Sequence, residues 1–409
     1  NIIKVIYNLL VNITEFFIWI LSNFNRKIRL GLIGRKESFD KIKSSININD
    51  KVIWVHCSSL GEYEQGLPVF KKLKEKYTDH KIVLTFLSPS GYEVKKSSSI
   101  ADVVAYLPLD SNKNAKDFLK TVNPTLVVFV KNEIWPNYIK YVKNYGIKSA
   151  LICGKFKEGD LKFSWPFNFI ANSILKFDYI LVQDQESKNI IENFGHNNTF
   201  ICGDTRFDRV MNTLDKNNSI KYINEFKMNN KCIVAGSIWE GDQNIIVEYI
   251  NNCKEHTKFI LAPHEIDKNK INSLKNSINK KSILYSDLSY DNINMDVLII
   301  DNVGMLSRLY KYADIAYVGG GMGNSGLHNT LEPAAFGAPI IIGKNYSKFT
   351  EAKKMIELGG MYSIKNNEEF KTLLDSLITN EIESNKIGKI NYNFILENTG
   401  ATKKIMNYL

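Results

Sequence analysis

From Lys51 onward, short apolar runs alternate with longer stretches of helical period. Continuous Val, Ile, Leu and Phe runs are typical of parallel strands buried on both faces, and the stretches between them predict crossover helices, such as one over 62–77. We expect strands at 52–57, 82–86, 103–107, 126–130, 149–153 and 179–182, and in the second half at 232–236, 259–262, 297–301, 315–319 and 339–342. The pattern therefore predicts an α/β protein with two parallel sheets in succession.

A polar, Asn- and Lys-rich stretch at 205–220 separates the two series of strands. At 409 residues the chain is long enough for two cores. We expect Rossmann-like, doubly wound domains over 37–205 and 206–409. Because open α/β sheets bind ligands beyond the carboxyl ends of their strands, we expect the chemistry in a cleft between the two domains.

The segment 2–21 is apolar and nearly long enough to cross a bilayer. It also carries Lys4, Asn8, Asn12 and Glu15, so a helix lying in the interface fits equally well. Five basic residues follow without an acid among them, namely Arg26, Lys27, Arg29, Arg35 and Lys36. Residues 1–36 are therefore expected to form a membrane anchor with a basic juxtamembrane segment, with an amphipathic helix packed on the first domain as the alternative.

The net charge and the spacing of the cysteines limit the classes of protein to which the chain can belong. A net charge of +10 indicates a partner such as nucleic acid, anionic lipid or a phosphorylated substrate. The five cysteines are scattered and never in C-x-x-C spacing, which argues against a disulfide framework and a zinc site. With no cluster of metal ligands in the sequence, we expect a metal-independent reaction.

Two glutamates follow expected strands directly. Glu62 lies in the turn CSSLGEYEQG (57–66), where a carboxylate in the first turn of a helix could act as a general base or simply complement the helix dipole. Glu133 lies in VKNEIWPN (130–137) beside a tryptophan, where a structural role is the alternative. His56, inside an apolar strand, is expected to be a hydrogen-bonded core histidine.

The most informative stretch is VGGGMGNSGLHNTLEPAAFGAPIII (318–342). Glycines that follow a strand and precede a helix, expected over 327–336, predict a cradle of backbone N–H groups for a phosphate, with Gly320 and Gly321 among them. Asn329 and Glu332 share a face of that helix, where a carboxylate can bind ribose hydroxyls. The glycine spacing is not G-x-G-x-x-G, so a dinucleotide oxidoreductase is the weaker reading.

Six strings in this order resemble the bacterial 3-deoxy-D-manno-oct-2-ulosonic acid (Kdo) transferases of lipopolysaccharide synthesis: WVHCSSLGE, NEIWPN, GDTRFD, AGSIWEGD, APHEID and GLHNTLEPAAFGAP. The resemblance covers nearly the whole chain. It implies a GT-B fold, CMP-Kdo as donor, and lipid IVA, the acylated and phosphorylated precursor of lipid A, as acceptor. It also implies no cofactor, anionic inner-membrane lipids but no nucleic acid as partners, and a place at the cytoplasmic face of the inner membrane.

The resemblance also implies roles for individual residues. Glu62 matches the family's general base, while Glu133 and Arg206 match groups that stabilise charge in the transition state. Arg206 stands where the family usually has lysine. The expected CMP-binding positions are Ser237, Pro263, His264, Val303, Gly304, Met305, Gly320, Gly321, Asn329, Thr330, Leu331 and Glu332.

The chain departs from the family pattern at three places. His264 and Glu265 replace the usual Arg-His, Lys131 replaces the first acid of E-x-E-x-W-P, and Lys155 replaces an arginine. Lysine cannot copy a bidentate arginine, so donor affinity is the property most exposed to these changes. Alternatives to the transferase are a sugar-nucleotide enzyme of the same shape, such as a UDP-sugar epimerase or transferase, and a peripheral membrane-binding module.

Overall fold

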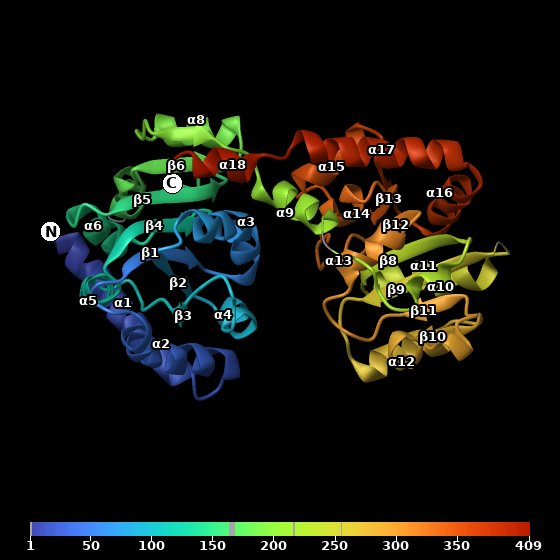
Figure 1. The fold of residues 1–409 in the computed structure, drawn as a ribbon, viewed down its shortest axis with the longest axis horizontal. Coiled ribbons are helices and arrows are strands. Elements are labelled where there is room, and N and C mark those ends of the chain that lie inside the picture. Colours follow the sequence, from blue (N-terminus) through green and yellow to red (C-terminus); the bar gives the residue numbers. More distant parts are fainter. Residues whose placement is uncertain (1, 163–167, 216, 255) are drawn as a thin grey trace. The chain divides into compact units, whose positions relative to one another are not determined.

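Two parallel sheets organise the chain, one in each of two units (Figure 1). The first unit comprises Asn1–Arg209 and Thr399–Leu409, and the second Val210–Asn398. The computed structural model describes residues 2–162, 168–215, 217–254 and 256–409, and all elements below lie in those ranges. The expectation of two successive α/β units is confirmed.

The first sheet has the strand order β3-β2-β1-β4-β5-β6-β7, with every pair parallel. Its strands are β1 (Lys51–Cys57), β2 (His80–Phe86), β3 (Val103–Tyr106), β4 (Pro124–Val130), β5 (Lys148–Gly154), β6 (Tyr179–Val182) and β7 (Thr199–Ile201). The order reverses between β1 and β4, which is where open α/β sheets form a crevice at their carboxyl edge.

Helices cover both faces of this sheet and bury a separate apolar cluster on each. They are α3 (Leu60–Lys76), α4 (Pro89–Lys95), α5 (Asn112–Val122), α6 (Pro136–Asn144), α7 (Asn168–Asn172) and α8 (Gln185–Asn193). Successive β1 side chains alternate between the clusters: Trp54 packs with Tyr138 on one face, and Val55 with Phe70 on the other. Burial on both faces explains why the strands read as unbroken apolar runs.

The second sheet has the order β10-β11-β9-β8-β12-β13-β14 and reverses between β8 and β12. Its strands are β8 (Lys231–Ile238), β9 (Thr257–Pro263), β10 (Ser282–Leu284), β11 (Val297–Ile299), β12 (Ile315–Val318), β13 (Ile340–Gly343) and β14 (Met361–Ile364). Its helices are α10 (Ile223–Lys227), α11 (Glu240–Asn252), α12 (Lys268–Ser277), α13 (Leu306–Leu309), α14 (Leu331–Ala335), α15 (Thr350–Glu357), α16 (Asn367–Thr379) and α17 (Glu381–Glu397). The sequence analysis missed β7, β10 and β14, because three or four residues at a sheet edge leave little apolar signal.

The N-terminal segment forms α1 (Ile2–Leu21) and α2 (Arg26–Ser45). By length and composition, α1 could cross a membrane, with a mean hydropathy of 1.5. The expected boundary at residue 36 falls inside α2, which belongs to the first unit. Arg35, expected in the juxtamembrane segment, instead donates to the carbonyl of Leu87 at 2.7 Å, so it is part of the folded unit.

Hydrogen bonds tie the first half of α1 to the first unit. The Tyr7 hydroxyl donates to Asp110 Oδ2 at 2.9 Å, and its ring packs edge-on against Phe169 at 5.3 Å. Asn8 Oδ1 accepts the backbone N–H of Asn112 at 2.6 Å. Asp110 is buried and also accepts the first N–H groups of α6 at 3.0 and 3.1 Å, so one carboxylate holds two helices.

The C-terminal helix α18 (Ala401–Met406), red in Figure 1, packs beside α3 and belongs to the first unit. Asp208, in α9 (Thr205–Leu214), accepts the N–H groups of Gly400 and Thr402 and the Thr402 hydroxyl, each at 2.6 Å. The expected second domain over 206–409 is therefore corrected at both ends. The strand pattern gave no signal for this return, because it depends on long-range contacts, namely the Asp208 hydrogen bonds and the burial of Ile405 and Leu409 in the core of the first unit.

We expect Asp208→Ala to release the C-terminal segment and to lower the free energy of unfolding of the first unit by about 2 kcal/mol, since a charged acceptor of three hydrogen bonds is lost. Limited trypsin digestion should then cleave faster after Lys403 or Lys404. Asp215→Ala, which removes an exposed acid just beyond the same helix, is the matched control and should leave cleavage unchanged. Equal cleavage rates in both variants would contradict this role.

Candidate active site

Glu62 sits at the start of α3, directly after β1. Its Oε2 accepts the backbone N–H of Ser58 and, at 3.3 Å, that of Ser59, which forms a capping box. Glu62 therefore does have a structural role, because it caps the N-terminus of α3. Both bonds go to Oε2, so Oε1 is the atom that can face a substrate.

Glu133 follows β4, the strand that pairs with β1 at the reversal of the sheet order. Its Oε2 accepts the indole N–H of Trp135 at 2.6 Å and lies 3.7 Å from Nε2 of His56. The side chain is only 14% exposed. The two glutamates thus follow adjacent strands at one edge of one sheet, as the strand-end pattern predicted.

The environments of the two carboxyls push their pKa values in opposite directions. Burial raises the pKa of Glu62, and the charge of Glu133 raises it further. Burial also acts to raise the pKa of Glu133, but the neighbouring His56 and Ser58 and the hydrogen bond from Trp135 outweigh it and lower the pKa overall. Such a separated pair is typical of sites where one carboxyl takes up a proton and the other stays charged.

A hollow of about 390 Å³ opens beside Glu133. Its walls are mostly apolar and come from the loop after β4, the segment after β5, and α7. The apolar side chains that line it are Ile134, Trp135, Phe156, Leu161 and Ile170. The hollow offers room for a group with both polar and apolar parts.

Arg206 begins α9, and its guanidinium pairs with Asp204, with Nη2 to Oδ2 at 2.7 Å. Asp204 also accepts from the amide of Gln65 at 3.1 Å, and Gln65 lies one turn after Glu62 on α3. Asp204 therefore connects Arg206, on α9, to α3, the helix that carries Glu62. The side chain of Arg206 is 37% exposed. A guanidinium so placed can meet negative charge.

Two of the departures from the family pattern lie near these groups. Lys131 has a left-handed backbone, with φ of 65°, and its positive charge acts to lower the pKa of Glu62, against the larger effect of burial. Lys155 is held by mutual backbone and side-chain bonds with Asn132, at 2.6 and 3.1 Å, and its ammonium lies 3.9 Å from Asp184. The loops after β4 and β5 are thereby joined.

In the second unit the expected donor-binding positions lie at the carboxyl ends of four adjacent strands. Ser237 is near the end of β8, Pro263 ends β9, Val303 to Met305 follow β11, and the glycine loop follows β12. Ser237 and Gly304 both have positive φ, 53° and 88°, and an added Cβ at Gly304 would meet nothing within 4 Å. The sheet therefore brings these segments to one edge, as the sequence predicted.

The glycine loop is held by Asp242, which the sequence analysis did not single out. This fully buried carboxylate accepts the N–H of Gly320 at 2.8 Å, the Tyr317 hydroxyl at 2.7 Å and the N–H of Trp239 at 2.9 Å. The Gly319 N–H bonds to Gly236. The expectation that Gly320 donates to a phosphate is thus corrected, because its amide is already engaged; the role of Gly321 stays a prediction.

The helix after this loop is also shorter than expected. It runs over Leu331–Ala335 instead of 327–336, with Thr330 at its N-cap. Asn329 accepts the N–H of Leu331 at 3.2 Å, and Glu332 lies in the first turn. Residues 327–330 form no helix because the chain there follows the glycine loop, where His328 bonds back to Gly319.

Three rings form a stack that the sequence did not predict. His264 stacks on both Trp239 and His328, with centroid distances of 4.3 and 4.5 Å, and the rings of Trp239 and His328 are themselves 6.4 Å apart. The indole N–H of Trp239 donates to Nε2 of His328 at 2.9 Å, and burial together with His264 lowers the pKa of His328. Glu265, the other departure here, pairs with Lys270, which offsets its negative charge beside the donor positions.

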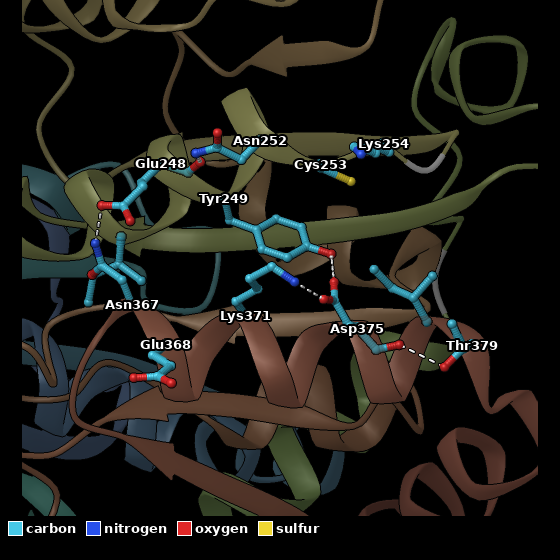
Figure 2. A pocket seen from close by; sticks show the side chains of 12 residues that line it. Glu248, Tyr249, Asn252, Cys253, Lys254, Asn367, Glu368, Lys371, Asp375 and Thr379 are labelled. Carbon is cyan, nitrogen blue, oxygen red and sulfur yellow. Dashed lines mark hydrogen bonds and ion pairs between the residues drawn. The ribbon is translucent and has the colours of Figure 1, made fainter.

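Another hollow lies away from these strand ends, between the second half of α11 and α16, which lines it from Asn367 to Thr379 (Figure 2). Its polar side chains bind one another. The Tyr249 hydroxyl donates to Asp375 at 2.6 Å, Lys371 pairs with the same carboxylate, and Asn367 donates to Glu248. These contacts join two helices, and none of the predicted site residues lies among them.

Comparison with known proteins identifies the family. Residues 27–209 match the family model described as 3-deoxy-D-manno-octulosonic-acid transferase (kdotransferase). The chain is 32% identical over 344 residues to the 3-deoxy-D-manno-octulosonic acid transferase of Aquifex aeolicus, covering 82% of this chain and 89% of that protein. The chain belongs to the Kdo transferase family. It is 26% identical to the Haemophilus influenzae member, over 87% of this chain and 86% of that one, and it is by family a glycosyltransferase.

Solved structures agree on the fold. The UDP-GlcNAc 2-epimerase of Neisseria meningitidis matches with a TM-score of 0.61 at 15% identity, over 88% of this chain and 99% of that one. MurG of Acinetobacter baumannii matches with a TM-score of 0.54 at 11% identity, over 88% and 98%. The two Rossmann-like units of this Kdo transferase are thus of the GT-B class. At these identities the likeness concerns the fold alone, so the epimerase reading gains no support from it.

The structure assembles the predicted residues as two half-sites, one in each unit. Glu62 and Glu133 come together, with Arg206 linked to them through Asp204 and Gln65. The donor positions come together at the second sheet. That a cleft joins the two half-sites stays a prediction, as does a reaction without metal or cofactor.

We expect Gly320→Ala to lower the free energy of unfolding of the second unit by about 3 kcal/mol and to weaken nucleotide binding. Its φ is 92°, and an added Cβ would lie 2.1 Å from the carbonyl oxygen of Gly326. Gly323→Ala, where a Cβ meets nothing within 4 Å, is the matched control in the same loop. Thermal unfolding of both variants measures the difference, and equal midpoints would contradict the packing argument.

Proposed function

We propose that this Kdo transferase moves Kdo from CMP-Kdo to lipid IVA, with inversion at the anomeric carbon, in lipopolysaccharide synthesis. The observation that carries the proposal is the pair Glu62 and Glu133 at the β1/β4 reversal, with pKa values shifted apart, in a chain of this family. The donor and the acceptor are those that the family resemblance implies.

In the proposed step, Glu62 Oε1 takes the proton of an acceptor sugar hydroxyl. The hydroxyl oxygen forms a bond to the anomeric carbon of Kdo, and the bond from that carbon to the phosphate oxygen of CMP breaks on the opposite face. The raised pKa of Glu62 makes it a stronger base, because proton affinity rises with pKa. CMP leaves with the electron pair and therefore with added negative charge.

That charge needs stabilisation, for which we propose Arg206 and the donor half-site. The candidates in the second unit are Ser237, Pro263, His264, Val303, Gly304, Met305, Gly321, Asn329, Thr330, Leu331 and Glu332. His264 stands where the family has arginine and is fixed in the ring stack. A single imidazole offers fewer donors than a guanidinium, so we expect weaker donor binding than in relatives that keep the arginine.

We expect Glu62→Gln to lower kcat by about 10²–10⁴-fold while leaving CMP affinity and folding unchanged. The glutamine oxygen can still accept from Ser58 and Ser59, so the variant removes the base without removing the helix cap. The assay is transfer from CMP-Kdo to lipid IVA with the product mass as readout. The same mass counts the sugars added.

Glu75→Gln, an exposed acid on the same helix, is the control and should keep full activity. Undiminished turnover by a folded Glu62→Gln variant would refute the base assignment. Turnover of UDP-GlcNAc by the native chain, without transfer from CMP-Kdo, would refute the function itself.

We also propose that α1 and α2 attach the enzyme to anionic lipid at the cytoplasmic face of the inner membrane. On α1, large apolar side chains are exposed, among them Phe16, Phe17 and Trp19. Arg26, Lys27 and Arg29 at the start of α2 are exposed beside them. Exposed aromatic and basic residues together are typical of helices that lie in the headgroup region.

The attachment of α1 to the first unit favours a helix that lies along the membrane over one that crosses it. The less exposed positions of α1 are Ile3, Tyr7, Asn8, Val11, Ile18 and Ile20, and all but Ile20 follow a helical stripe on one face. A crossing helix would have to break the Tyr7–Asp110 bond and leave a buried carboxylate without that donor. Lys4 then stays on the same side of the membrane as the folded unit.

We therefore expect the thiols introduced by Lys4→Cys and by the control Lys113→Cys, on α5, to react with a reagent added on the same side of the membrane. A membrane-impermeant maleimide is added to inside-out and to right-side-out membrane vesicles of an expression host, in a Cys253→Ser background. Labelling of the two positions in the same vesicle type supports the proposal. Labelling of them in opposite vesicle types would show that α1 crosses the bilayer.

A further inference from the structure

His56 lies in the middle of the proposed catalytic half-site, yet the proposed step does not use it. Its side chain is fully buried in β1. Nδ1 lies 2.9 Å from the hydroxyl oxygen of Thr85, and Nε2 lies 3.7 Å from Oε2 of Glu133. Among the described residues Nε2 has no closer hydrogen-bond partner, so this buried nitrogen points at Glu133.

The hydrogen-bond network around Thr85 assigns the proton of the imidazole. The indole N–H of Trp54 donates to the Thr85 oxygen at 2.8 Å, so that oxygen is an acceptor there. The single hydroxyl proton of Thr85 can go to Nδ1 of His56 at 2.9 Å or to the carbonyl of Val55 at 3.5 Å. The shorter contact is the better hydrogen bond, and it leaves the proton of a neutral imidazole on Nε2.

The opposite tautomer is disfavoured by electrostatics. With its proton on Nδ1, the imidazole would turn an unpaired lone pair toward the carboxylate of Glu133 in a buried site. Such a contact is repulsive and leaves a buried acceptor unsatisfied. A doubly protonated imidazole would also carry hydrogen on Nε2, so every favourable state presents an N–H to Glu133.

Glu133 connects this donor to the proposed base. Its Oε2 is held by Trp135 on one side and faces His56 on the other. The negative charge of Glu133 in turn raises the pKa of Glu62. Among the described residues, the ionisable groups around the pair also include Lys131 and the thiol of Cys57, whose pKa burial raises.

We propose that His56 is a positioning residue whose Nε2–H orients the carboxylate of Glu133 and keeps it anionic beside Glu62. The proposal rests on the proposed function, because Glu62 must act as the base for this arrangement to matter. It adds a role for a residue whose sequence context suggested only core packing.

Two substitutions separate the polar contact from packing. In His56→Gln the side-chain amide can extend to the place of Nε2 and donate to Glu133, whereas in His56→Asn it reaches only the place of Nδ1 beside Thr85. Both lose the ring that packs against Phe129 at 5.4 Å, so a purely structural role affects both in the same way.

We expect His56→Asn to lower kcat about tenfold, because the N–H that faces the Glu133 carboxylate at 3.7 Å is lost, with the KM for CMP-Kdo unchanged. The acid limb of its pH–rate profile should move to higher pH, because the doubly charged pair of Glu62 and Glu133 is then less stabilised. His56→Gln should restore most of the rate and the profile. Equal kcat and equal profiles in His56→Asn and the native enzyme would overturn the proposal while leaving the proposed function intact.

A second measurement does not depend on activity. In protein with 15N-labelled histidine, the imidazole signal that is absent in His56→Asn should be that of an Nε2–H tautomer. An Nδ1–H tautomer for His56 would overturn the proposal whether or not either variant is active. A native enzyme that fails to use CMP-Kdo would refute the proposed function, and this spectrum would still decide the orientation of the imidazole.

Discussion

The parallel pairing of β1 with β4 is the constraint on which the rest of the first half-site depends. Because the sheet order reverses there, the loops that leave the two strands diverge and open a crevice at the carboxyl edge. His56 lies on β1, Glu62 follows β1, and Glu133 follows β4. The strand order of the second sheet reverses in the same way between β8 and β12, and the expected donor-binding residues lie at the carboxyl ends of these and the neighbouring strands.

Buried or half-buried carboxylates are the recurring means by which both units fix their loops. Asp110 holds α1 and the start of α6, Asp208 holds the C-terminal segment, and Asp242 holds the glycine loop. Each accepts several N–H or O–H groups, which offsets the cost of burying its charge. Glu133 follows the same pattern. Glu62 differs because burial, together with the charge of Glu133, raises its pKa and one oxygen stays available, so that this helix cap is also a candidate base.

Ring contacts replace charge in the donor half-site of this chain. His264 stands in a stack with Trp239 and His328 where relatives carry an arginine, and Glu265 is matched by Lys270. The site thereby keeps its shape with less positive charge. In the proposed donor complex, the phosphate would be bound by backbone groups other than the amide of Gly320, which donates to Asp242.

The sequence by itself determined the two sheets, the strand ends that carry Glu62 and Glu133, and the family, because long apolar runs and local strings are properties of neighbouring residues. It missed the short edge strands, the length of α14, the return of residues 399–409 and the roles of Asp242 and His56. Only the tertiary structure decided these, since a hydrogen bond between Asp242 and Gly320, or the burial that sets a pKa, depends on which distant strands become neighbours.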